Sequence, residues 1–178
     1  SEFSLKYIES GTSAFEDCGS LTEIRIPDRV TKIGKQAFYH SGLTAADVSV
    51  FVTEIGDKAY YHCDALQEIR VDPENPNYCD VDGVLFNKDK TVLLKYPEDK
   101  KDKTYTVPDG VTEIAAEAFM GKRHLTSVVL PESLTKIGYD AFLGRPRRFR
   151  LVCADDNEIV RQYAEHYGIT LETGGTLE

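Results

Sequence analysis

The stretch LTSVVLPESLTKIGYDAF, residues 125–142, carries a pattern that recurs along the chain and decides its fold. Each copy ends in an alanine followed by an aromatic residue, and these alanines are Ala14, Ala37, Ala59, Ala118 and Ala141. Successive alanines lie 23, 22, 59 and 23 residues apart. A period near 23 residues predicts a solenoid, in which each repeat is one coil whose apolar core is completed by its neighbours.

The clearest copy is LTEIRIPDRVTKIGKQAF, residues 21–38. Ile24 and Ile26 have the two-residue period of a strand with one buried face, and Pro27 ends the strand because it has no N–H to donate. A second inward-facing segment ends at Gly34, where a side chain would obstruct the backbone at a bend. Stacked coils therefore predict parallel strands about 4.8 Å apart, with equivalent residues forming ladders along the stack.

This pattern, L-x-x-I-x-I-P followed by V-T-x-I-G-x-x-A-F, resembles the BspA-like branch of the leucine-rich repeat family over about residues 5–171. The resemblance implies a right-handed, mainly β repeat solenoid of about 23-residue units that binds rather than catalyses. It also implies an origin in secreted or surface-anchored bacterial proteins, or some protist ones, that act as adhesins or interaction modules. A generic parallel β-helix is the rival architecture, but such proteins lack the P-x-x-V-T-x-I-G-x-x-A-F block.

We expect residues 1–171 to form a single solenoid. Residues 1–20 supply only the second half of a coil, with Leu5 and Ile8 at inward positions. The N-terminal edge then lacks a cap, and since an open edge is a liability, we expect a longer natural protein to continue upstream. The terminal residues Ser-Glu-Phe and Gly-Gly-Thr-Leu-Glu are typical of cloning remnants around an excised fragment.

The repeat pattern breaks at residues 72–104, which we interpret as an insertion. Its start, DPENPNY, is too rich in Pro and Asn for a strand or a helix. Residues 83–96, GVLFNKDKTVLLKY, predict a β-hairpin with a polar loop at residues 87–90. Similar insertions occur in the resembling family, which implies a structural role.

Residues 154–171 are predicted to cap the last coil. Asp155, with Glu158 three residues on, is a candidate N-cap, and Gly168 is a candidate C-cap. The predicted apolar face of the helix is Ile159, Val160, Tyr163, Ala164 and Tyr167. A short strand at residues 169–171 follows, and residues 172–178 are predicted to be a disordered tail.

The net charge of -9 argues against nucleic acid or an anionic membrane as the main partner, and no apolar run reaches the length of a membrane helix. Cys18 and Cys63 occupy equivalent positions two coils apart, too far for a disulfide, so we interpret both as buried thiols. No catalytic triad, phosphate loop or metalloprotease helix is present, and no cofactor is predicted.

Two groups of residues deserve weighing as metal sites. Asp17, His40 and His62 stand two residues after the aromatic of successive repeats, where later copies have Gly121 and Gly144. A second group is Asp80, Asp82, Gly83, Asn87 and Asp89, which faintly resembles a calcium loop without its spacing. Exposed turns are the simpler interpretation of both groups.

The outward face of the first strands is the favoured binding surface, because solenoids commonly bind through such extended faces. The residue between the two inward positions of each strand forms a ladder: Arg25, Asp47, Arg70, Thr106, Val129 and Val152. This ladder is polar and alternately charged early in the chain and apolar late, where exposed valines would anchor a partner.

Basic residues gather at the corners of the last regular coils: Lys122, Arg123, Arg145, Arg147, Arg148 and Arg150. They would attract an acidic partner or a sulfated glycan, or else form a solvated rim beside the acidic start of the cap helix. Tyr39, Tyr60 and Tyr61 cluster on neighbouring coils, where they would either stack on a sugar or cover a corner.

The sequence therefore predicts a non-enzymatic leucine-rich repeat module for protein recognition or adhesion in a secreted or cell-surface bacterial protein. Its expected partner is a protein or another extracellular macromolecule such as a glycan, with no membrane insertion. The alternatives are a carbohydrate-binding or spacer domain of an extracellular multidomain enzyme and, less favoured, a hydrolase.

Overall fold

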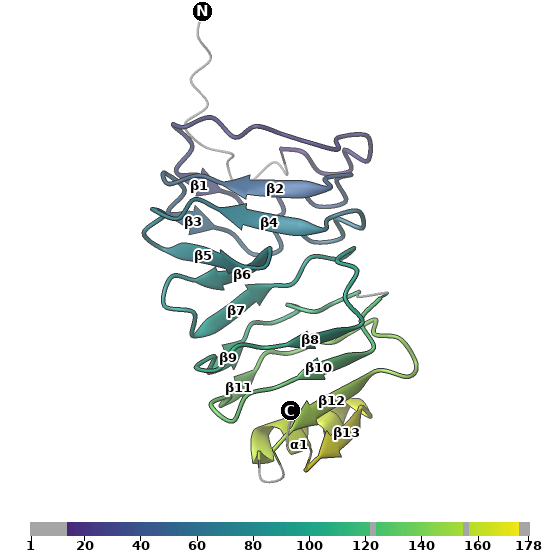
Figure 1. The fold of residues 1–178 in the computed structure, drawn as a ribbon. Helices are drawn as coiled ribbons and strands as arrows, with labels where there is room; N and C mark the ends of the chain where they lie inside the picture. The colour runs from purple at the N-terminus through teal and green to yellow at the C-terminus, as the bar shows by residue number, and fades with distance from the viewer. Residues whose placement is uncertain (1–13, 122–123, 155–156, 175–178) are drawn as a thin grey trace, which may run out of the picture.

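The structure is a computed structural model that describes residues 14–121, 124–154 and 157–174, and these form a stack of coils (Figure 1). The early strands are β1 (Lys32–Ile33), β2 (Ala45–Val48), β3 (Glu54–Ile55), β4 (Glu68–Val71), β5 (Tyr78–Val81), β6 (Val84–Asn87) and β7 (Val92–Lys95). The later elements are β8 (Thr104–Thr106), β9 (Glu113–Ile114), β10 (Ser127–Val129), β11 (Lys136–Ile137), β12 (Arg150–Cys153), α1 (Glu158–Tyr167) and β13 (Thr170–Thr173).

Parallel pairing between equivalent strands confirms the predicted solenoid. The first strands of the coils form two sheets, β2-β4 and β8-β10-β12-β13, and the second strands form β1-β3 and β5-β6-β7-β9-β11. Asp47 pairs with Arg70 in the first set, and Ile33 pairs with Ile55 in the second. The predicted strand at residues 24–26 is not formed. Thr22 O accepts from Thr44 N at 3.0 Å, but no backbone hydrogen bond from the next coil reaches residues 24–26 in the described part of the chain.

The corners at Ala37, Ala59, Ala118 and Ala141 each contain two residues with positive φ, one just before the alanine and one three residues after it. In the early coils the positive-φ residues are Asp17, Gln36, His40, Lys58 and His62, and in the later coils Glu117, Asp140, Gly121 and Gly144. This backbone directs every second amide along the stack. Gln36, Phe38 and His40 donate to backbone carbonyls of the next coil at 3.0, 2.9 and 3.1 Å. The Asp17-His40-His62 ladder is therefore a set of left-handed turn residues.

Aromatic rings fill the coils as aligned stacks, as predicted. Ring centroids are 5.5 Å apart for Phe15 and Phe38, and 5.4 Å for Phe38 and Tyr60. A second stack joins Tyr96 to Phe119 at 5.1 Å and Phe119 to Phe142 at 4.9 Å. Tyr96 thus occupies the aromatic slot of a coil whose sequence lacks the Ala-aromatic pair.

The insertion is a three-stranded meander rather than one hairpin, because β5 pairs antiparallel with β6 and β6 with β7. Strand β7 then pairs parallel with β9, so the insertion replaces the second strand of a coil. Figure 1 shows β5, β6 and β7 between the two ends of the stack. Leu85 belongs to the N-terminal core, while its neighbours Val84 and Phe86 belong to the C-terminal core, so β6 packs on both.

The segment DPENPNY is correctly predicted as irregular up to Asn77, but Tyr78 begins β5. Asn75 donates to the carbonyls of Ser49 and Val52, both at 2.8 Å, and Asn77 donates to Thr53 O at 2.7 Å. These amide side chains replace strand pairing between the meander and the coil before it.

The C-terminal cap ends the corner hydrogen bonds with two tyrosines of α1. The Tyr167 hydroxyl accepts from Asp140 N at 3.1 Å, and the Tyr163 hydroxyl accepts from Phe142 N at 3.4 Å. Equivalent amides of earlier coils donate to backbone carbonyls of the next coil. Gly168, with φ of 60°, is the C-cap, as predicted.

Three details of the predicted cap were wrong. The N-cap is Asn157, whose side chain accepts from Val160 N at 3.1 Å, whereas Asp155 lies outside the described residues. Ile159 is 37% exposed because the buried face of the helix consists of Val160, Tyr163 and Ala164. Strand β13 continues past residue 171 to Thr173, since its backbone pairs with β12, so the tail is ordered at residues 172 and 173.

Replacing Gly138 with alanine is expected to lower the free energy of unfolding by about 3 kcal/mol. A Cβ atom there would lie 2.3 Å from Ala116 N and 2.6 Å from Ala116 Cα, and this backbone belongs to the coil before. Chemical denaturation would measure the loss. The control is Gly19→Ala, whose Cβ meets nothing within 4 Å and whose stability should change by less than about 0.5 kcal/mol.

Tyr60→Phe is expected to raise the free energy of unfolding by about 1 kcal/mol, because the buried Tyr60 hydroxyl has no hydrogen-bond partner among the described residues. Tyr78→Phe is the matched contrast. The Tyr78 hydroxyl accepts from Ile55 N at 3.0 Å, so its removal should cost about 1 kcal/mol. Equal effects of the two substitutions in thermal and urea denaturation would contradict this assignment.

Candidate interaction surface

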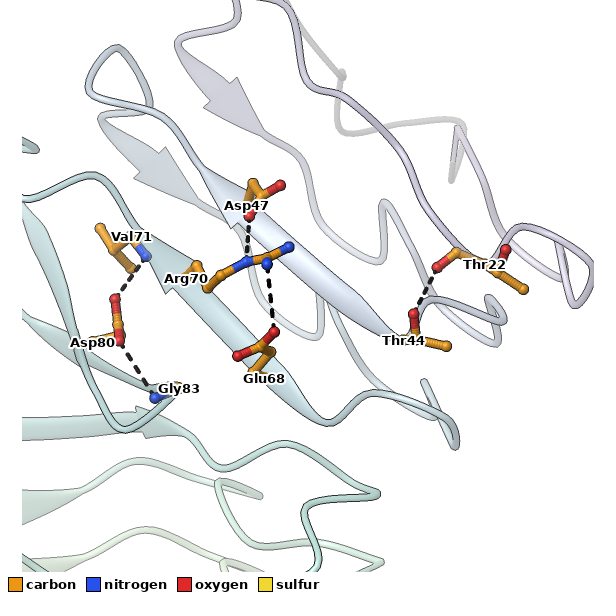
Figure 2. Close-up of polar contacts among 8 residues, drawn as sticks. All are labelled: Thr22, Thr44, Asp47, Glu68, Arg70, Val71, Asp80 and Gly83. Atoms are coloured by element: carbon orange, nitrogen blue, oxygen red, sulfur yellow. Dashed lines mark hydrogen bonds and ion pairs between the residues drawn. The ribbon is translucent and has the colours of Figure 1, made fainter.

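The outward side of β2, β4, β8, β10 and β12 is called the strand face here. Its early half, on β2 and β4, carries a group of charged side chains (Figure 2). The guanidinium of Arg70 on β4 lies 2.8 Å from Asp47 on β2 and 3.5 Å from Glu68 on its own strand. Arg25 is exposed on the preceding coil and makes no ion pair with any described residue. Arg25, Asp47 and Arg70 border a shallow groove of about 360 Å³.

The meander interrupts the strand face after β4. The Asp80 carboxylate accepts from Val71 N at 2.8 Å and from Gly83 N at 3.3 Å (Figure 2). In addition, Ile69 N donates to Gly83 O at 2.8 Å. The turn after β5 therefore covers the edge of β4, so the predicted ladder is two sheets and not one continuous surface.

In the late half, Thr106, Val129 and Val152 are in register, as the repeat predicts. They line a groove of about 560 Å³ that extends over Pro131. Val129 is only 7% exposed, so the expectation of an exposed valine anchor at this position was wrong. Any contact with Val129 would require a side chain that enters the groove.

The arginines of the predicted basic corner differ in their contacts. Arg145 donates to the carbonyls of Phe142 and Tyr167, the last residue of α1, so it neutralises the negative end of the helix rather than its acidic start. Arg150 pairs with Glu172 at 3.1 Å. Arg147 and Arg148 are exposed without an ion pair in the described part of the chain, and Lys122 and Arg123 lie outside that part.

The tyrosines divide in the same way. Tyr60 is buried in the ring stack, whereas Tyr39 and Tyr61 are half-buried on the corner, with centroids 5.6 Å apart and nearly parallel rings. Lys58 Nζ lies 4.9 Å above the Tyr61 ring, and the His40 ring stacks on Tyr39 at 4.6 Å. Their ring faces are thus largely occupied by neighbours.

The residues of the two candidate metal sites lie in turns. Asp82 and Gly83 have φ of 50° and 76° and form the turn between β5 and β6, while the Asn87 side chain accepts from Thr91 N and Val92 N, both at 2.9 Å. His40 Nδ1 lies 3.2 Å from Asp17 Oδ1. Among the described residues, no group of three or more His, Cys, Asp or Glu side chains is placed to hold a metal ion.

The cysteines are free thiols. Cys63 is buried, as predicted, and donates to Phe38 O at 3.0 Å, whereas Cys18 is only half-buried. Burial raises the pKa of the Cys63 thiol to about 11, which disfavours a reactive thiolate. No helix in the described ranges has the length and apolarity needed to span a membrane.

The sequence profile of the BspA type Leucine rich repeat region matches six copies, over residues 2–88 and 98–163. The chain belongs to this BspA-type leucine-rich repeat family. The matched ranges include both halves of the strand face, and they exclude β7 with most of the loop before it, the end of α1 and β13. No curated protein matches the chain.

Solved bacterial structures share the fold. A leucine-rich repeat protein from Eubacterium ventriosum is 28% identical over 74% of this chain, with a TM-score of 0.66. A leucine rich cell surface protein from Faecalibacterium prausnitzii is 28% identical over 80%, with a TM-score of 0.67. The pneumococcal vaccine antigen PcpA is 28% identical over 82%, with a TM-score of 0.69. The chain spans 38, 43 and 38% of the lengths of these three proteins.

Arg145→Ala is expected to lower the free energy of unfolding by about 1 kcal/mol, since the last carbonyl of α1 loses a charged donor. Arg147→Ala is the control and should change stability by less than about 0.5 kcal/mol, because its side chain is exposed and unpaired among the described residues. Thermal denaturation would compare them. A loss in the Arg147 variant as large as that in the Arg145 variant would contradict the capping role.

Proposed function

We propose that this chain is a non-enzymatic recognition module that binds a protein partner through the strand face, in a secreted or cell-surface bacterial protein. The observation that carries the proposal is the exposed row of alternating charges formed by Arg25, Asp47 and Arg70, with Glu68 beside Arg70 on the same strand. Alternating charges favour a partner with a complementary pattern, and they reject like charges at each position.

The scaffold supports this function because it fixes the charged side chains before binding. Asp47 and Arg70 are held in register by β2-β4 pairing, and Arg70 Nε donates to Asp47 Oδ1 at 2.8 Å. A preformed surface loses less side-chain and backbone freedom on association than a flexible loop does. Family membership and the relative described as a cell surface protein agree with the extracellular setting.

A carbohydrate-binding or spacer domain of an extracellular enzyme is the alternative function. The parallel Tyr39 and Tyr61 rings are the observation that bears on sugar binding. Because Lys58 and His40 already contact these rings, the strand face is the better-supported surface.

Reversing Arg25 and Arg70 together to Glu is expected to weaken capture of the cognate protein at least about tenfold. The assay is an array of purified extracellular proteins, read at two salt concentrations, beside a glycan array. The control reverses Arg147 and Arg148, which lie on the basic corner, and should leave capture unchanged. If only the control variant lost protein capture, the binding site would lie on the basic corner. If the chain bound a glycan and Tyr39→Ala or Tyr61→Ala abolished that binding, the alternative function would be favoured.

A further inference from the structure

One coil has a corner two residues shorter than the others. In a regular corner, the stacked aromatic residue follows the last inward aliphatic residue by five positions, as Tyr60 follows Ile55 and Phe119 follows Ile114. Leu93, which pairs with Ile114, is followed only three residues later by Tyr96, which stacks on Phe119. The coil between Tyr60 and Phe119 therefore cannot reach as far outward as its neighbours.

A cavity of about 260 Å³ lies where this corner is short. Residues 55–61 form one wall and residues 115–117 the opposite wall, with Tyr78, Leu85 and Leu94 among the apolar lining. The two walls are joined by an ion pair between Lys58 and Glu117, 3.0 Å apart, whose residues lie on coils that are not adjacent. A space of this size admits one large side chain rather than a drug-sized molecule.

The wall at residues 55–61 also lacks its hydrogen-bond partners. In the preceding coil, the amides of Gln36, Phe38 and His40 all donate to the next coil. The equivalent amides are Lys58, Tyr60 and His62, and none of them donates to a backbone or side-chain acceptor within the described residues. Since these positions repeat the same backbone geometry, their N–H groups face the missing corner.

The ring stack stops at the same place. Phe38 and Phe119 each have an aromatic neighbour on both sides, whereas Tyr60, in the described part of the chain, has only Phe38. Tyr60 lines the cavity. A ring entering there would lie against Tyr60 and the apolar lining, beside the charged residues Lys58, Lys95 and Glu117.

We propose that the short corner between Tyr60 and Phe119 is a docking site for a peptide segment of a protein partner. The segment supplies backbone carbonyls to the amides of Lys58, Tyr60 and His62 and inserts one aromatic side chain into the cavity. Main-chain hydrogen bonds would give affinity and the cavity would give specificity, as in binding to a sheet edge. The inference rests on the proposed function only in that both require a protein partner.

The probe is a capped peptide with the sequence of residues 137–144, IGYDAFLG, which is a regular corner of this same chain. Amide hydrogen exchange of the free protein should show Lys58, Tyr60 and His62 exchanging at least about tenfold faster than Gln36, Phe38 and His40. The peptide should slow exchange at the first three positions, and a peptide carrying Phe142→Ser should bind at least about tenfold more weakly. Slow exchange of all six amides in the free protein would overturn the proposal.

Variants locate the site independently of the strand face. Ala115→Leu fills the cavity and should abolish peptide binding, while Ala45→Leu on β2 is the matched control and should bind normally. Glu117→Gln breaks the ion pair across the cavity and should bind as tightly or more tightly. Arg25→Glu with Arg70→Glu should leave peptide binding intact, so failure of this site and failure of the strand face are separable. Binding that survives Ala115→Leu would place the peptide elsewhere and refute the proposal.

Discussion

The structure depends on hydrogen bonds between the corners of successive coils. Two residues of positive φ per corner turn alternate amides along the stack, so that three N–H groups of one coil meet three carbonyls of the next. Left-handed residues cost about 1 kcal/mol or more when they are not glycine, and most of these positions are Asp, Gln, His, Lys or Glu. The cost is tolerated because the interlocked coils determine the backbone there. Coil length, ring stacking and strand register all follow from this one alignment.

The features that recur in every repeat could be predicted from the sequence. Inward aliphatics, aligned rings and parallel register were foreseeable because identical residues recur at a fixed period. Gly138 was also foreseeable as a position without room for a side chain, and its neighbour is the backbone of the preceding coil. The meander was only half predicted, since residues 72–104 do not repeat and β5 owes its place to contacts with distant residues such as Ile55 and Thr53. Similarly, Tyr96 gives no local sign that it occupies an aromatic slot.

Side-chain partners on the candidate surface were harder to predict than backbone register. The repeat placed Asp47 opposite Arg70, but it does not show that Glu68 shares the same guanidinium. Arg145 looked like Arg147 and Arg148 in the sequence, although only Arg145 reaches the end of α1. Val129 was expected to be exposed because alternation places it outward, yet it is only 7% exposed and lies in the wall of the groove that also contains Pro131. The Arg145 contact depends on a segment outside the repeat unit, whereas Glu68 and Pro131 lie in the same repeats as Arg70 and Val129, where the pattern fixes backbone position but not side-chain contacts.

A solenoid of equal coils would leave no gap between corners, because each coil satisfies the amides of the one before it. The coil that contains the meander cannot do so, since its second strand is supplied by β7 and its corner is short. The cap shows what the fold does when a neighbour is missing: Tyr163 and Tyr167 bring hydroxyl acceptors to Phe142 N and Asp140 N. At the short corner, the described residues supply no such acceptor, and the Lys58–Glu117 ion pair joins the walls instead. The Lys58 and Glu117 side chains are only 35% and 11% exposed, and β6 joins the two halves of the stack as well, because it packs on both cores. Since β6 packs on both cores, the stack would stay joined at this corner if a bound segment displaced the ion pair.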